Sequence, residues 1–239
     1  MSDQGSLVVV ADVEALAETA AARIVELLFP VLAKQPRASL AVSGGRTPLP
    51  AYQQLALMSR GLEWDRIDLY FADERCVAPD DRESNYGQVT KRLLPPLLPE
   101  APILFRMRGE LPDAEAAARE YEAVLPDRLD LIVLGVGEDG HTASLFPGSK
   151  GLGERERRVL AVDSPKPPSR RLTLAPRAIH EARELIVLAA GPAKAEAVAL
   201  ARSAATDPIR CPARLARRGT WIVDREAAAL IGGQRARSD

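Results

Sequence analysis

Short apolar runs alternate with longer amphipathic segments along this chain. Several of the short runs are apolar almost throughout, which is typical of parallel strands that are buried on both faces. We therefore expect strands at Leu7–Ala11, Ser39–Val42, Ile67–Phe71, Leu129–Gly135, Val159–Val162, Arg171–Leu174, Glu184–Ala189 and Thr220–Val223.

The amphipathic segments between these runs predict helices. The clearest extends from Val13 to Lys34, because its apolar residues recur at helical spacing and Asp12 can cap its first turn. Further helices are expected to begin near Pro48, Ser84, Asp113, Pro192 and Arg225.

This alternation predicts an α/β fold with a mostly parallel, doubly wound, Rossmann-like sheet and helices on both faces, and it allows a small additional β-containing lobe. We expect a single domain over residues 1–239, with a flexible tail over 232–239. In such sheets ligands bind at the carboxyl ends of the strands. The candidate chemistry should therefore lie in the loops that lead from strands to helices.

Composition narrows the class of protein. The 32 Lys and Arg residues nearly balance the 33 Asp and Glu residues, which argues against a general nucleic-acid binder. Two cysteines and two histidines give no metal-ligand cluster. The N-terminal sequence has neither a signal peptide pattern nor a membrane span. We expect a cytoplasmic monomer or small homo-oligomer with reduced thiols and no membrane partner.

Two of the loops can hold an anion or a polar substrate. Ser43, Gly44, Gly45 and Arg46 follow a strand and precede a helix, where free N–H groups and the helix dipole favour phosphate. A Gly-Gly turn alone is more often only structural. The second loop places charged groups at the end of the next strand and continues through a helix start; its candidate residues are Asp73, Arg75 and Asn85.

The third loop carries the candidate base. His141 stands two residues after Asp139 on a loop with glycines on both sides. A histidine titrates near neutral pH and can take a proton from water, and a nearby carboxylate can fix its tautomer. Gly135, Gly137 and Gly140 also spell GxGxxG, but Pro147 soon interrupts any helix, so we reject a dinucleotide site. His180 is predicted to be a surface histidine on a helix.

Two later cations complete the candidate site. Arg171 begins a strand after a Pro-rich loop, and this position alone leaves a structural and a functional role equally open. Lys194 falls in a first helical turn, where the dipole disfavours a cation unless an anion is shared. We interpret Lys194 as part of a phosphate site.

Together these loops resemble the family of 6-phosphogluconolactonases and glucosamine-6-phosphate isomerases. The matching segments are SGGRTP at Ser43, FADERCVAPDDRESNYG at Phe71, DLIVLGVGEDGHTASLFPG at Asp130, SPKPPSRRLTL at Ser164, GPAKAEAV at Gly191 and, more weakly, CPARLARRGTWIVDREAA at Cys211. The resemblance implies hydrolysis of 6-phospho-D-glucono-1,5-lactone to 6-phosphogluconate, without metal or cofactor. It also implies His141 as the base, Arg75 near the reacting carbonyl, and phosphate binding by Ser43, Gly44, Gly45, Arg171 and Lys194.

Two alternatives remain at this point. A deaminase of the same family has an Asn-Glu-Pro stretch after its Gly-His pair, whereas this chain has Thr142–Pro147 and lacks that glutamate. A sugar-phosphate-sensing module without turnover would be expected to carry a DNA-binding domain, for which this chain has no spare length, and it would have no need of His141.

Overall fold

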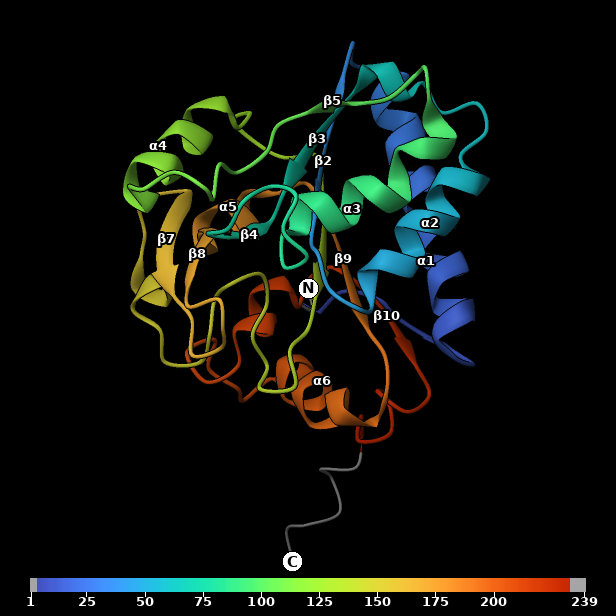
Figure 1. Cartoon of the computed structure of the whole chain (residues 1–239). Coiled ribbons are helices and arrows are strands. Elements are labelled where there is room, and N and C mark those ends of the chain that lie inside the picture. The colour runs from blue at the N-terminus through green and yellow to red at the C-terminus, as the bar shows by residue number, and fades with distance from the viewer. Residues whose placement is uncertain (1–3, 233–239) are drawn as a thin grey trace, which may run out of the picture.

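The computed structural model describes residues 4–232, and its centre is a seven-stranded sheet (Figure 1). The strands are β1 (Leu7–Val10), β2 (Ala38–Val42), β3 (Ile67–Phe71), β5 (Ile103–Leu104), β6 (Leu131–Gly135), β9 (Glu184–Ala189) and β10 (Thr220–Asp224). Their order in space is β1-β10-β9-β6-β2-β3-β5, and all neighbouring strands are parallel.

Helices cover both faces of this sheet. Alternate residues of each strand point to opposite sides, so each strand packs against helices on both faces. Leu40 and Val42 pack with α1 (Val13–Leu32), α2 (Pro48–Met58) and α3 (Asn85–Leu93). Ala41 points the other way, toward α4 (Ala114–Val124), α5 (Pro176–Glu181) and α6 (Ala195–Arg202). Burial on both faces explains why the strands are apolar without alternation.

A second, smaller sheet lies on the side of α4 (Figure 1). It is antiparallel, in the order β4 (Asp73–Arg75), β8 (Arg170–Leu174) and β7 (Val159–Asp163). Its apolar residues, including Leu172, join the core between the large sheet and α4. The predicted fold class is thereby confirmed, small β lobe included.

Most predicted helix starts are found where the sequence placed them. Asp12 caps α1 through the N–H groups of Glu14 and Ala15, although the helix ends at Leu32 rather than Lys34. Pro48 begins α2, Ser84 caps α3 and Asp113 caps α4. Near Pro192 the chain first forms a 3-10 turn, η4 (Pro192–Lys194), and the regular helix α6 starts three residues later than expected.

One predicted helix is wrong. From Arg225 to Gly232 the chain forms successive turns instead. Asp224 accepts a hydrogen bond from the N–H of Ala227 and so caps a first turn, but Leu230 stays half exposed, so little apolar burial supports a longer helix. Of the predicted flexible tail, residues 233–239 lie outside the described residues.

The order in which strands are added to the sheet reverses between β2 and β6, which are adjacent and parallel in the sheet but far apart in sequence. The chain runs outward from β2 to β3 and β5, then returns to the other side of β2 for β6, β9 and β10. A crevice opens at such a switch point, outside the carboxyl ends of the strands. Within the described residues, no helix is long and apolar enough to cross a membrane.

Candidate active site

A cleft of about 730 Å³ lies at this switch point. The loops after β2, β6 and β9 line it, together with β4, β8 and the start of α3. It contains every site residue that the sequence predicted except Asp139, namely Ser43, Gly44, Gly45, Arg46, Asp73, Arg75, Asn85, His141, Arg171 and Lys194. Asp139 lies directly behind His141.

The loop after β6 folds back on itself and presents His141. Its turn is closed by two backbone hydrogen bonds, from the N–H of Gly137 to the carbonyl of His141 and from the N–H of Gly140 to the carbonyl of Gly137. A Cβ on Gly137 would lie 2.0 Å from Nδ1 of His141, so the imidazole needs a glycine there. Gly140 has a φ of 81°, and the segment from His141 to Pro147 forms no helix.

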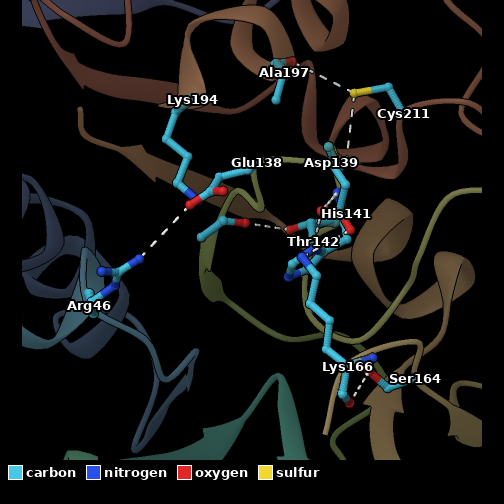
Figure 2. A network of polar contacts seen from close by, with 12 residues as sticks. Arg46, Glu138, Asp139, His141, Thr142, Ser164, Lys166, Lys194, Ala197 and Cys211 are labelled. Carbon is cyan, nitrogen blue, oxygen red and sulfur yellow. Dashed lines mark hydrogen bonds and ion pairs between the residues drawn. The ribbon is translucent and has the colours of Figure 1, made fainter. Parts of the chain in front are cut away.

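Asp139 and Lys166 hold the imidazole of His141 (Figure 2). Oδ1 of Asp139 is 2.5 Å from Nδ1 of His141, and Oδ2 of the same carboxylate is 3.1 Å from Nζ of Lys166. Burial opposes ionisation of Asp139, but the contacts with His141 and Lys166 outweigh it and hold the pKa of Asp139 well below its usual range. The contact at Nδ1 leaves Nε2 as the ring nitrogen available to a water molecule.

The imidazole is packed on one side and reachable from solvent on the other. Its ring contacts the ring of Phe146 with the centroids 4.6 Å apart, and 23% of the side chain is exposed. This combination fixes the orientation of His141 while leaving a path for water.

The Gly-rich loop after β2 has an orphan hydroxyl. Tyr52, from α2, donates a hydrogen bond to the carbonyl of Ser43 and accepts one from its N–H, which fixes the backbone there. Oγ of Ser43 is buried and has no hydrogen-bond partner in the part of the chain that the structure describes. Thr47 occupies the cap position of α2, as expected, but its side chain makes no cap bond.

Asn85 connects β4 to this loop. Its side-chain N–H group donates to the carboxylate of Asp73 at 3.0 Å, while its oxygen accepts from Arg75 at 2.5 Å. A Cβ on Gly44 would lie 1.9 Å from Oδ1 of Asn85, so this close approach requires glycine at 44. Oδ2 of Asp73 also accepts from Ser144, 2.7 Å away. The amide therefore lies at the junction of three loops.

Glu74 holds the start of α3, which carries Asn85, against β4. Its carboxylate is buried and accepts hydrogen bonds from the N–H groups of Asn85 and Tyr86 and from the hydroxyl of Ser84, so it caps α3. Burial raises the pKa of Glu74, and these backbone hydrogen bonds oppose the rise.

Two arginines lie side by side on neighbouring strands of the small sheet, β4 and β8. Arg75 pairs directly with Arg171, so their like charges are adjacent. Arg171 is buried, and its guanidinium donates to the carbonyl of Pro168 in the preceding loop. Burial lowers the pKa of Arg171 and the charge of Arg75 acts in the same direction, while Asp73 opposes the shift. Such a pair is well suited to an anionic ligand.

Lys194 and Arg46 also line the cleft, and both point toward Glu138 (Figure 2). Lys194 is largely buried, with 16% of its side chain exposed, whereas Arg46 is almost fully exposed. Both approach the carboxylate of Glu138, at 3.8 and 3.9 Å. Burial is the main cause that lowers the pKa of Lys194.

Sequence reasoning missed Lys166, Glu138 and Glu74. Lys166 lies inside the Pro-rich segment from which only Arg171 was chosen, and Glu138 lies directly before Asp139. Glu74 stands between two predicted site residues. Only the charge of these residues marked them, because the loop contacts that give them a role are not visible in the sequence. Among residues 4–232, no group of three or more His, Cys, Asp or Glu side chains could hold a metal ion.

The family of glucosamine-6-phosphate isomerases and 6-phosphogluconolactonases matches residues 11–223, which is most of the chain. The chain belongs to this family.

Similar members of the family include two bacterial 6-phosphogluconolactonases. The protein from Streptomyces coelicolor is 39% identical, over 97% of this chain and 96% of its own. The protein from Mycobacterium tuberculosis is 36% identical, over 95% of this chain and 98% of its own. The crystal structure of a 6-phosphogluconolactonase from Shewanella baltica superposes with a TM-score of 0.82 at 29% identity, over 92% of this chain and 97% of that one.

Proposed function

We propose that this chain hydrolyses 6-phospho-D-glucono-1,5-lactone to 6-phosphogluconate, in the oxidative pentose phosphate pathway. The observation that carries the proposal is the arrangement of the cleft. A base held by a carboxylate, His141 with Asp139, faces the same cavity as the orphan hydroxyl of Ser43 and the cations Arg171 and Lys194. Relatives that match this chain over nearly its full length are named 6-phosphogluconolactonase, which supports the same substrate.

In the proposed reaction, water is the nucleophile. Nε2 of His141 takes a proton from a water molecule, whose oxygen attacks the lactone carbonyl carbon. The developing oxyanion is stabilised by Arg75. The ring C–O bond then breaks and the imidazolium gives its proton to the departing ring oxygen, which leaves a hydroxyl group and a carboxylic acid. The acid releases its remaining proton to solvent at neutral pH, so the product is a carboxylate. A δ-lactone is already an activated ester, so no covalent nucleophile is required.

The remaining residues position the substrate and the base. Ser43, Gly44, Gly45 and Arg46, with Arg171 and Lys194, bind the phosphate, whose binding energy orients the distant lactone ring. Asp73 orients Asn85 toward the substrate hydroxyls. Lys166 is a positioning residue, because its ammonium group fixes the carboxylate that fixes His141.

We place this activity in a cytoplasmic monomer or small homo-oligomer. The two free thiols, Cys76 and Cys211, and the balanced charge are consistent with a reducing compartment.

The direct test is turnover of freshly generated lactone by the purified chain, with the spontaneous rate subtracted. We expect rapid formation of 6-phosphogluconate and no release of ammonia from glucosamine 6-phosphate, because residues 142–147 contain no carboxylate. Ammonia release with no lactone hydrolysis above the spontaneous rate would refute the proposal.

A further inference from the structure

Glu138 approaches two cations of the cleft, Lys194 and Arg46 (Figure 2). Its Oε1 is 3.8 Å from Nζ of Lys194 and 3.9 Å from the guanidinium of Arg46. These distances are longer than a hydrogen bond, and 56% of the Glu138 side chain is exposed. The carboxylate is therefore held by charge alone and is free to move.

Lys194 needs a negative charge nearby. Burial lowers the pKa of Lys194, and the positive charges of Lys166 and Arg46 act in the same direction, whereas Glu138 opposes the shift, as does the more distant Asp139. Glu138 thus supplies the nearest countercharge for a partly desolvated ammonium group when no ligand is bound.

The neighbouring carboxylate shows the contrast. Asp139 has both oxygens fixed, at 2.5 Å from His141 and 3.1 Å from Lys166. One segment thus carries a fixed carboxylate directed to the base and a loosely held one directed to the phosphate cations.

We propose that Glu138 is an internal counter-ion, which the phosphate of the ligand displaces from Lys194 and Arg46. The inference rests on the proposed function, which assigns these two cations to phosphate. Because displacement costs the Glu138 contacts, every phosphorylated ligand binds more weakly than the cations alone would allow. The product 6-phosphogluconate consequently leaves faster, so Glu138 tunes affinity and release and takes no part in the bond-breaking steps.

The test is a calorimetric titration of 6-phosphogluconate into the wild type and Glu138→Gln. Exposed charge pairs contribute up to about 1 kcal/mol, which corresponds to about fivefold in affinity, so we expect Kd to fall about three- to fivefold in the variant, with a parallel fall in KM for the lactone. Inorganic phosphate should inhibit the variant at correspondingly lower concentration, while unphosphorylated glucono-1,5-lactone should be hydrolysed at the wild-type rate.

Glu226→Gln is the matched control, because Glu226 is exposed on the same cleft and the substitution changes the charge equally. Its Kd for 6-phosphogluconate should stay within about twofold of the wild type. Equal tightening in both variants would show a general field effect and overturn the inference, as would an unchanged Kd in Glu138→Gln. A wild type that does not bind 6-phosphogluconate would instead refute the proposed function, and the inference with it.

Discussion

His141 depends on contacts from two loops that are distant in sequence. Asp139 comes from its own loop, but Lys166 comes from the connection between β7 and β8, where Ser164 holds the backbone by accepting from the N–H of Lys166. The position of the proposed base is therefore set partly by a loop of the small sheet.

Replacing this ammonium group should slow catalysis. In Lys166→Met the carboxylate of Asp139 loses one of its two anchors, so we expect kcat to fall about three- to tenfold. Lys166→Arg keeps the charge and should recover most of the lost kcat. Lys150→Met, at an exposed lysine of η3 (Lys150–Gly153), is the control for loss of charge. An equal loss of kcat in Lys166→Met and Lys166→Arg would contradict a role for the ammonium charge.

The sequence predicted the pairing of Asp139 with His141 because the two residues are close along the chain. Asp139 and His141 are two residues apart, and the glycines around them mark a loop. The contact between Lys166 and Asp139 could not be predicted in the same way, because it depends on how two separate loops fold toward each other.

Among the elements, β4 and α3 together build the floor of the cleft. Glu74 in β4 accepts from backbone N–H groups at the start of α3, which fixes Asn85 in register with Asp73 and Arg75. The strand is only three residues long, and its position depends on this side chain as well as on β8.

Removing the carboxylate should loosen the whole floor. Glu74→Ala leaves buried donors without an acceptor, so the free energy of unfolding should fall by about 2 to 4 kcal/mol. Urea denaturation measures this loss, and kcat/KM should fall with it because Asn85 loses its anchor. Glu100→Ala, at an exposed glutamate, should change neither quantity. Unchanged stability in Glu74→Ala would contradict the role given to β4.

Strands that are buried on both faces were predicted correctly, whereas the two shortest strands were not. The apolar runs were found as β2, β3, β6 and β9 because burial on both faces leaves a clear signal. By contrast, β4 reads Asp-Glu-Arg and β5 has two residues, so neither carries a strand pattern. The helix expected at Arg225 failed because Ala-rich sequence favours a helix locally but supplies little surface to bury.

For the whole molecule, the cleft is a consequence of topology. The chain enters the sheet at β1, moves outward through β2, β3 and β5, and returns beside β2, so the loops after β2 and β6 must meet. The sequence predicted this class of fold from the alternation of elements, but not the strand order, which depends on packing across both faces.

Stability of the whole chain should vary with pH through Asp139. Its pKa is lowered in the folded state, so its ionised form stabilises the fold above the ordinary aspartate pKa, and this contribution is lost as the pH falls below that value. We expect Asp139→Asn to lower the free energy of unfolding at neutral pH, and its difference from the wild type to shrink between about pH 4 and pH 2. Urea denaturation across this range checks it, with the exposed Asp80→Asn as control. A difference independent of pH would contradict the assignment.

In the proposed site one cleft holds a base and a phosphate anchor apart. Lactone hydrolysis and 6-phosphogluconate affinity, measured together in His141→Ala and Lys194→Ala, distinguish the two roles. We expect His141→Ala to lose about 10²- to 10⁴-fold in kcat while its Kd for the product stays within about twofold. Lys194→Ala should instead weaken that Kd by at least about tenfold with a smaller loss of kcat. Full turnover in His141→Ala, after subtraction of the spontaneous rate, would show that His141 is not the base.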